Sequence, residues 1–315
     1  MSTNAAELST LSYAKYGKTN VRVFRIVRGD DGLHTVVEYS VETLLEGDIE
    51  TSYTEADNSV VVATDSILAK TSPYILSPEK FALHIGTFFS SKYAHIHKVH
   101  VTVTQLRWSR ITVDGKEHKH SFYRDGDDRR VVKAIVDATA GKHALTATLT
   151  SGLTDLLVLK STGSAFENFY RDEYTTLVPV DDRIFSTSVD LSYTFSDIKL
   201  VAPQDEAKTE FQVPLKEGDE GYAGSVWDDG VAERARKATL EVFAVDESAS
   251  VQATLYKMGQ RIIAENAGIK NVSYSLPNKH YIPVDMKYLG IDNLTPTAAQ
   301  TPARTFSSAL GTYVS

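Results

Sequence analysis

The amino-acid sequence predicts an α+β protein with two similar halves, each an antiparallel sheet with helices on one face. Three observations lead to this fold class. Segments of alternating apolar and polar residues are joined by short turns containing Asp and Gly, which is typical of antiparallel hairpins. Other segments carry apolar residues at helical spacing. The order of strands and helices in the first half then recurs in the second half with longer helices.

The first half opens with a predicted hairpin. A strand with Val21, Val23 and Val27 on one face leads into the turn Asp30-Asp31-Gly32, and its partner returns over residues 35–45. The other elements expected here are a helix over residues 78–92, preceded by the capping residue Ser77 and starting at Pro78, and strands over residues 99–113, 118–124 and 129–138.

The second half contains two segments with helical periodicity. Their apolar residues recur three or four positions apart, at Val231, Ala235, Ala238 and Val242 and again at Val251, Leu255, Met258 and Ile262. The strands expected in this half cover residues 145–149, 156–160, 183–195, 272–281 and 282–288.

This organisation divides the chain into four parts. They are a flexible N-terminal arm at residues 1–12, a first repeat at 13–140, a second repeat at 141–290 and a tail at 291–315. The tail is rich in Thr, Ala, Ser and Pro, a composition that predicts disorder.

The composition narrows the class of function. The chain has 315 residues, 42% of them hydrophobic and 23% charged, as in an ordinary globular protein. The net charge of −8 argues against nucleic acid or an anionic membrane as the main partner. The absence of cysteine excludes disulfides, thiol nucleophiles and thiolate metal sites. No apolar run approaches the roughly 20 residues of a membrane span, and residues 1–10 lack the apolar core of a signal peptide, which predicts an intracellular protein.

Residues 56–66 are the first candidate for a site. Val60 to Ala63 is an apolar run that predicts a strand buried on both faces, and it leads directly to Thr64, Asp65 and Ser66. Small polar side chains at a strand end are a common way to present polar groups to a pocket. The alternative interpretation is a turn or a helix N-cap.

Two further segments suggest a planar ligand. Residues 166–177 are dense in aromatic and charged side chains and precede Arg183, which offers a ring for stacking and a guanidinium for bidentate binding. A surface segment with a salt-bridged Arg is the alternative. Gln252, near a predicted helix start, carries both a donor and an acceptor. Asn278 and His280 stand beside a proline in a strand context that disfavours Asn.

The histidines offer a possible metal site. His95, His97 and His100 form one group, and His118 and His120 form another, with spacings that zinc sites use. No cysteine and no obvious acidic ligand accompanies them in the sequence, so core or subunit-interface histidines are the alternative.

These segments together resemble the urate oxidase (uricase) family, whose fold is a tandem repeat of the tunnelling fold (T-fold). The resemblance covers about residues 13 to 288, with the motifs in the order of the family. The motifs are residues 16–18 with 20–23, 44–47 with 50–54, 56–59 with 62–66, 118–122, 159–164, 171–177, 182–184, 249–254 and 276–281.

The resemblance implies oxidation of urate by O2 and water to 5-hydroxyisourate and H2O2, with neither a metal nor an organic cofactor. Its catalytic residues would be Lys18, Thr64 and His280. Lys18 would take the hydroxyl proton of Thr64, Thr64 would relay a proton from urate, and His280 would extend the relay.

The resemblance also implies the substrate contacts. Phe166 would stack on the purine, while Arg183 and Gln252 would clamp its edge. The remaining contacts would come from the backbone N–H groups of Val251 and Thr64, from Asp65 beside Thr64, and from Asn278, which would hold O2 or the attacking water above the ring.

The family further implies an assembly and a compartment. Its Lys and Thr come from a neighbouring subunit, which would make the working unit a homotetramer whose sheets close into a tunnel-shaped barrel. Many relatives are peroxisomal, which suits an enzyme that produces H2O2. The final residues Tyr313-Val314-Ser315 are not a Ser-Lys-Leu type signal, so cytoplasmic residence is the alternative.

The chain departs from the family in two places, which keeps two other interpretations open. It is several residues shorter just after Ser66, and the closing strand of the family is not recognisable after Tyr288. One alternative is an inactive uricase-like T-fold protein with a binding or structural role. The other is a different T-fold enzyme acting on a purine or pterin, with a metal on the histidine pairs.

Overall fold

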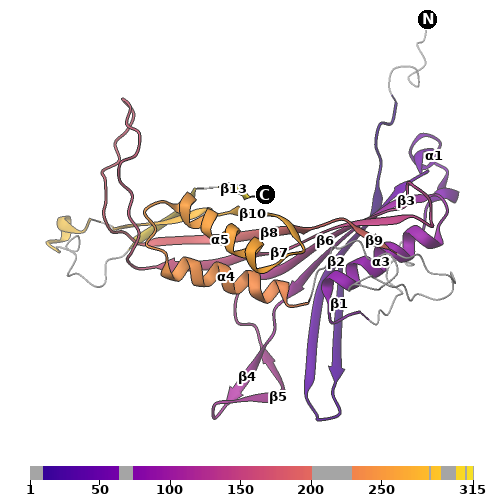
Figure 1. Cartoon of the computed structure of the whole chain (residues 1–315), viewed down its shortest axis with the longest axis horizontal. Coiled ribbons are helices and arrows are strands. Elements are labelled where there is room, and N and C mark those ends of the chain that lie inside the picture. The colour runs from indigo at the N-terminus through magenta and orange to yellow at the C-terminus, as the bar shows by residue number, and fades with distance from the viewer. Residues whose placement is uncertain are drawn as a thin grey trace, which may run out of the picture. The chain divides into compact units, whose positions relative to one another are not determined.

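The chain folds into two compact units. The computed structural model describes residues 10–63, 74–200, 229–283, 285–291, 303–308 and 311–314 (Figure 1). Unit 1 comprises Met1–Ser151 and Thr194–Asp229, and unit 2 comprises Gly152–Tyr193 and Gly230–Ser315. Each unit contains antiparallel strand pairs and helices, so the α+β fold class predicted from the sequence is confirmed.

The sheet of unit 1 has the strand order β1-β2-β3-β6-β7. Helix α3 (Pro78–Lys92) packs on β3 and β6 and buries Phe81 and Phe89. Its start is as predicted, because the side chain of Ser77 accepts a hydrogen bond from the backbone N–H of Lys80. The elements of this unit are β1 (Tyr16–Arg28), β2 (His34–Gly47), α1 (Glu50–Thr54), η2 (Asn58–Val60), β3 (Ile96–Leu106), β6 (Arg129–Asp137), the first part of β7 (Leu145–Lys160) and β9 (Ile198–Leu200), which pairs with β7.

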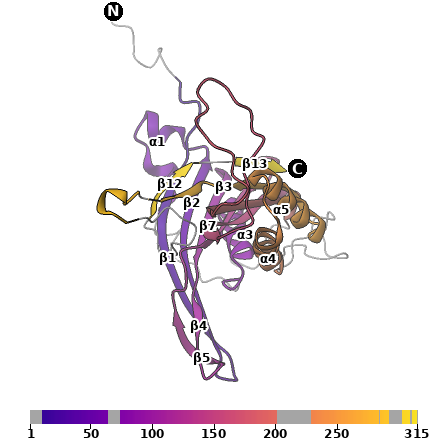
Figure 2. The ribbon, with the colours of Figure 1, turned by 90° about the vertical axis from the view of Figure 1, so that its left-hand side faces the viewer.

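A second hairpin, β4 (Ser109–Val113) and β5 (Lys116–Tyr123), lies beside the tip of the β1–β2 hairpin (Figures 1 and 2). Lys119 Nζ on β5 donates to the backbone oxygen of Asp31 at 2.9 Å. The strand predicted over residues 99–113 is therefore interrupted between β3 and β4. The reason is that Arg107 binds Asp125 in the turn after β5, at 2.7 Å, and Trp108 donates to Glu38 of β2 at 2.9 Å.

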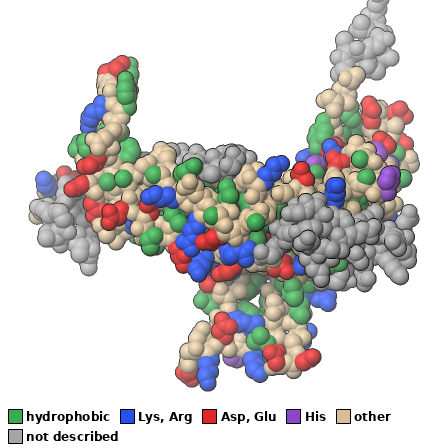
Figure 3. Space-filling view, viewed as in Figure 1, with side chains coloured by type: hydrophobic (Ala, Val, Ile, Leu, Met, Phe, Trp, Pro, Cys, Tyr) green, Lys and Arg blue, Asp and Glu red, His purple; other side chains and the backbone are tan. Residues whose placement is uncertain are grey.

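The sheet of unit 2 has the strand order β7-β8-β10-β13. Helices α4 (Val231–Val245) and α5 (Val251–Glu265) pack on each other, and α5 also packs on β10 and β13. Arg261 of α5 joins Glu241 of α4 at 2.6 Å, and Figure 3 shows acidic and basic side chains interspersed on this face. The remaining elements are β8 (Phe185–Phe195), β10 (Ile269–Ser275), β11 (Asn278–Pro283), η3 (Lys287–Leu289), β12 (Ala303–Ser308) and β13 (Gly311–Val314).

Several expectations for the second half differ from the structure. The strand predicted over residues 282–288 is wrong, because β11 ends at Pro283 and η3 covers Lys287–Leu289. The strands predicted over residues 145–149 and 156–160 are one continuous strand, β7. Asp155 has a left-handed φ of 61°, and its N–H donates to the Asp190 carboxylate at 3.0 Å, so this residue disturbs the alternation without ending the strand. The tail predicted to be disordered contains β12 and β13, whose backbones pair with β11 and β10.

The boundary between the two sequence repeats at residues 140 and 141 stays a prediction. The compact units divide elsewhere, because β7 and β8 each belong partly to both units. None of the helices in the described part of the chain is long and apolar enough to cross a membrane.

Candidate active site

Lys18 lies in β1 next to a break in the sheet register. Its backbone pairs with Thr43 of β2, and the next pair along is Val21 with Val41, so β1 has one extra residue between the two pairs. Asn20, in this bulge, has a left-handed φ of 56°. Bulges re-aim neighbouring side chains and often lie next to active sites. Lys18 is half-buried, and its position in a bulge distinguishes it from an ordinary strand lysine.

Tyr16 connects β1 to the segment that leads toward Thr64. The hydroxyl oxygen of Tyr16 accepts a hydrogen bond from the backbone N–H of Val62 at 2.6 Å. Burial raises the pKa of Tyr16 above its ordinary value, which keeps the hydroxyl neutral. Thr64 and Asp65 themselves lie outside the described residues.

The strand predicted over residues 60–63 is wrong. Val60 ends the short helix η2, and residues 61–63 have no regular structure. The cause is local, because the side chain of Asp57 accepts a hydrogen bond from the backbone N–H of Ser59 at 2.9 Å and caps this turn. The turn alternative considered for this stretch therefore describes it better.

In unit 2, three segments that are distant in sequence lie side by side. We call residues 163–166, 180–183 and 246–252 the platform. The segment 163–166 lies between the other two. On one side of it, the backbone N–H of Ser248 donates to the oxygen of Gly163 at 3.1 Å, and the backbone oxygen of Ser248 accepts from the N–H of Ala165 at 2.9 Å. On the other side, the N–H of Arg183 donates to the oxygen of Ser164 at 2.8 Å. The platform therefore holds Phe166, Arg183 and the start of α5 on adjacent backbones.

Asp182 fixes the outer edge of the platform. Its carboxylate accepts from the hydroxyl of Thr162 at 2.6 Å and from the N–H of Gly163 at 2.8 Å. These two hydrogen bonds hold the pKa of Asp182 below its ordinary range. Gly163 has a φ of 76°, a conformation that favours glycine, so the turn and its carboxylate clamp depend on each other.

Arg183 and Phe166 lie face to face. The guanidinium carbon of Arg183 is 4.9 Å from the ring centroid of Phe166, and the ring of Phe169 stacks on Phe166 at the same centroid distance, 4.9 Å. Burial lowers the pKa of Arg183. Its Nε is buried and has no hydrogen-bond partner among the described residues, which is costly for a charged group. Arg183 makes no ion pair with the residues that the structure describes, so the salt-bridged alternative has no support among them.

Val251 and Gln252 are the first two residues of α5. The first backbone N–H groups of a helix have no partner within it and carry a partial positive charge, which favours anions. Ser250 caps this end by accepting from the N–H of Ala253 at 3.4 Å. Its hydroxyl also lies 3.0 Å from the Oε1 of Gln252, which fixes the amide of Gln252 at the helix start.

Asn278 begins β11 and pairs with Thr187 of β8. It is 8% exposed, and its Oδ1 is buried without a hydrogen-bond partner in the described part of the chain. His280 lies two residues further along β11, where its backbone pairs with Phe306. Arg183 and Asn278 thus each bring a buried polar atom that the described residues leave unpaired.

Comparison with known proteins identifies the family. A family model described as Uricase matches residues 14–135 and 149–306. The chain belongs to the uricase family. The uricase of Emericella nidulans is 45% identical to it over 288 residues, which are 89% of this chain and 88% of that protein. The uricase of Aspergillus flavus is 44% identical with the same coverage.

Solved structures agree with this assignment. The uricase of Arthrobacter globiformis matches with a TM-score of 0.70 at 27% identity, covering 96% of this chain and 94% of that one. The uricase of Bacillus fastidious, at 22% identity, shares the fold with a TM-score of 0.73. The resemblance drawn from the sequence motifs is therefore confirmed at the level of family and fold.

Four of the histidines singled out in this uricase-family chain, His97, His100, His118 and His120, make other contacts. His97 Nε2 lies 3.0 Å from an oxygen of Asp48, and the ring of His118 lies edge-on to His120 at 4.5 Å. Among the residues that the structure describes, no group of three or more His, Asp or Glu could hold a metal ion.

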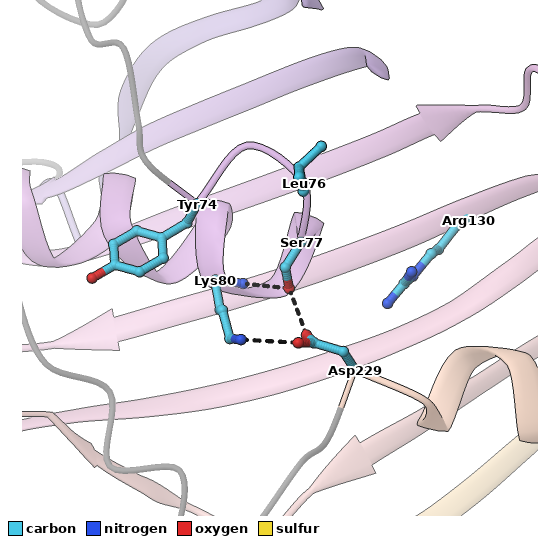
Figure 4. Close-up of a pocket in the computed structure, with 6 residues that line it drawn as sticks. All are labelled: Tyr74, Leu76, Ser77, Lys80, Arg130 and Asp229. Carbon is cyan, nitrogen blue, oxygen red and sulfur yellow. Dashed lines mark hydrogen bonds and ion pairs between the residues drawn. The ribbon is translucent and has the colours of Figure 1, made fainter. Parts of the chain in front are cut away.

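A cavity of about 320 Å³ in unit 1 is separate from the candidate residues (Figure 4). Its charges are paired, because Asp229 lies 3.0 Å from Lys80 Nζ and accepts from the hydroxyl of Ser77 at 3.2 Å. The cavity is lined by Tyr74, Leu76, Ser77, Lys80, Arg130 and Asp229.

Sequence reasoning assigned no role to Ser164, Asp182 or Ser248. Ser164 and Ser248 are each 1% exposed, and the Ser164 hydroxyl has no hydrogen-bond partner among the described residues. The available signal was the run of small polar residues over 161–164 together with the acidic pair before Arg183. Such runs mark turns, but they do not say which distant segment the turn contacts.

Proposed function

We propose that this chain is a urate oxidase. It oxidises urate with O2 and water to 5-hydroxyisourate and H2O2. Urate loses two electrons to O2, which takes up two protons to become H2O2, and the oxygen of water is added to the purine. Membership of the uricase family, with relatives 45% and 44% identical over most of the chain, supports this proposal.

The half-buried Arg183 guanidinium over the Phe166 ring is the observation that carries the proposal. Urate is planar, anionic and rich in carbonyl groups, so it suits an aromatic ring for stacking and a guanidinium for bidentate binding. A urate oxygen bonded to Nε would remove the desolvation penalty that Arg183 bears, roughly 1–3 kcal/mol or more for a charged group. A purine stacked on Phe166 takes the place of either the Arg183 guanidinium or the Phe169 ring.

The other binding roles follow from the same chemistry. Gln252 binds the purine edge opposite Arg183, and the N–H of Val251 donates to urate from the positive end of α5. Asn278 holds O2 or the attacking water above the ring, and a water at this place can donate to its buried Oδ1. Thr64, through its backbone N–H, and Asp65 complete the substrate contacts.

The proposed catalytic apparatus is a proton relay. Lys18 accepts the hydroxyl proton of Thr64, so that Thr64 can take a proton from urate, and His280 extends the relay. The resulting urate dianion is electron-rich enough to reduce O2 itself. The reaction therefore needs no metal and no organic cofactor, with O2 as the co-substrate.

The proposed working unit is a homotetramer with active sites at subunit interfaces, each using Lys18 and Thr64 of one chain with the platform of another. Sheets that close into a barrel across subunits also remove exposed strand edges. Peroxisomal residence suits a producer of H2O2, and cytoplasmic residence is the alternative. Fluorescence microscopy of the tagged full-length chain beside a peroxisomal marker distinguishes these compartments.

The test follows the loss of urate absorbance in the near ultraviolet together with O2 uptake. Chelator-treated wild type is compared with a Lys18→Met variant and with a matched control, Lys15→Met, which removes an exposed lysine three residues earlier. Urate loss that survives chelation and collapses only in Lys18→Met is expected. No urate loss from folded wild type would overturn the proposed function. Loss that disappears on chelation would instead restore a metal mechanism at the histidines.

A further inference from the structure

The linker between α4 and α5, residues 246–250, contacts the platform segment 163–166 as well as the helices. Asp246 caps the end of α4, where its N–H donates to the oxygen of Val242 at 3.0 Å, and Ser250 caps the start of α5. Between them, Ser248 makes both of its backbone hydrogen bonds with the middle platform segment, residues 163–165. The linker therefore sets the distance between the start of α5 and Phe166.

A buried polar chain connects Asp246 to that contact. Thr254 Oγ1 lies 2.6 Å from Asp246 Oδ2 and 2.9 Å from Ser248 Oγ. A hydroxyl has one proton, so Thr254 donates it to the nearer of these two oxygens, the ionised carboxylate, while its Oγ1 stays in contact with the Ser248 hydroxyl at 2.9 Å. Thr254 and Ser248 are each 1% exposed, so water does not compete for these bonds.

The carboxylate at the head of this chain is held from two further directions. The second carboxylate oxygen of Asp246, Oδ1, pairs with Lys257 Nζ. The backbone oxygen of Asp246 accepts from Lys160 Nζ at the end of β7. The Asp246 side chain is 10% exposed. Burial alone would raise the pKa of Asp246, but the hydrogen bonds from Lys257 and Thr254 outweigh it and leave this pKa below its ordinary value. Asp246 is therefore ionised at neutral pH.

We propose that Asp246 is a positioning residue of the purine site, acting through Thr254 and Ser248 to hold the start of α5 against the segment that carries Phe166. The inference rests on the proposed function, because it takes Val251 and Gln252 as purine contacts. If Asp246 only joined α4 to α5, its ion pair with Lys257 on α5 would be enough. The contact through Thr254 instead ends at Ser248, whose backbone makes hydrogen bonds with Gly163 and Ala165. Loss of this contact should loosen the purine clamp while leaving the proton relay of Lys18 in place.

The test compares two pairs of variants. Thr254→Val removes the hydroxyl, and Thr254→Ser keeps it. Asp246→Asn removes the charge, and Glu247→Gln, the exposed carboxylate next to it, is the matched control. The measurements are KM and kcat for urate, the Kd of xanthine, a purine that lacks the C8 oxygen of urate, and the melting temperature.

Thr254→Val and Asp246→Asn are expected to raise both the urate KM and the xanthine Kd about tenfold, with kcat changed less than about threefold. Thr254→Ser and Glu247→Gln should stay within about twofold of wild type. A lower melting temperature with wild-type KM and Kd in Thr254→Val would overturn the proposal, because the network would then serve stability alone. The Thr254 pair decides the question even where Asp246→Asn does not fold.

Hydrogen exchange separates this proposal from the proposed function. Thr254→Val should exchange faster than wild type at the amides of residues 163–166 as well as at 248–252, because the two segments share the Ser248 bonds. If wild type neither oxidises urate nor binds xanthine, the proposed function fails, and exchange alone tests the positioning. Unchanged exchange at residues 163–166 in Thr254→Val would overturn the positioning role of Asp246.

Discussion

Replacing Gly17 by Ala is expected to displace Lys18 while unit 1 stays folded. A Cβ at position 17 would lie 1.9 Å from the backbone oxygen of Thr43 and 2.9 Å from the Cα of Leu44, both in β2. Carbon and oxygen approach to about 3.3 Å at the closest, so β1 and β2 must separate by more than about 1 Å at this point. Among the described strands, β1 has a sheet partner on one side only, so it can move away.

The cost can be worked out from the ladder. Separation weakens the backbone pairs on either side of Gly17, Tyr16 with Leu45 and Lys18 with Thr43. At roughly 0.5–1.5 kcal/mol for each hydrogen bond, the free energy of unfolding should fall by about 2 kcal/mol. Lys18 moves with the displaced strand, and if it has the proposed catalytic role, a shift of about 1 Å is enough to lower turnover tenfold or more.

The assay measures urea unfolding and urate turnover of Gly17→Ala beside a control, Gly115→Ala. Gly115 has a φ of 75°, and no heavy atom lies within 4 Å of the place that a Cβ would take, so Ala there adds backbone strain without a clash. The control should lose about 1 kcal/mol of stability and keep its turnover. Wild-type turnover and stability in Gly17→Ala would refute the reasoning, since Lys18 would then not depend on the close approach of the strands.

Three further variants test other contacts. Tyr16→Phe removes the acceptor for the N–H of Val62; the melting temperature should fall by an amount equivalent to about 1 kcal/mol and the urate KM should rise several-fold. Glu79→Ala leaves the partly buried guanidinium of Arg130 without its carboxylate at 2.6 Å, and urea unfolding should show a loss of about 3 kcal/mol. Because the pKa of Asp246 lies below its ordinary 3.8, its stabilisation is complete above that pH and is lost as the pH falls through the lowered pKa; the stability advantage of wild type over Asp246→Asn, measured by urea unfolding, should therefore shrink below about pH 3.8.

The elements that were predicted correctly are those whose cause is local. Ser77 and Pro78 set the start of α3 by capping and by a fixed φ, and the apolar stripe of α5 is buried as its spacing predicts. The strand predicted over Val60 to Ala63 failed because an apolar run says nothing about a turn that is capped by Asp57 and takes in Val60. β12 and β13 were missed because their hydrogen bonds come from strands distant in sequence, and their composition carries no alternation.

The candidate site was predictable to a similar degree. An aromatic ring with an arginine indicated a planar ligand from residue chemistry alone, and the family motifs supplied the individual roles. The platform was not predictable, because Ser248 bonds Gly163 and Ala165 across more than 80 positions of sequence. No periodicity or turn preference encodes such a contact, which depends on where β7 and α4 end.

Four of the described candidate residues share one structural property that explains why they suit a binding role. Lys18 adjoins a bulge, Arg183 precedes the first residue of β8, Val251 begins α5 and Asn278 begins β11. At such interruptions the sheet and helix ladders do not use every backbone and side-chain polar group, so some are left for a ligand. β8 and α5, next to Arg183 and Val251, are packed through buried residues, which fixes these groups at little entropic cost on binding. Changes that restore regularity, such as deletion of the extra residue in β1, should therefore stabilise the sheet and abolish urate turnover. A deletion variant that kept its turnover would contradict this account.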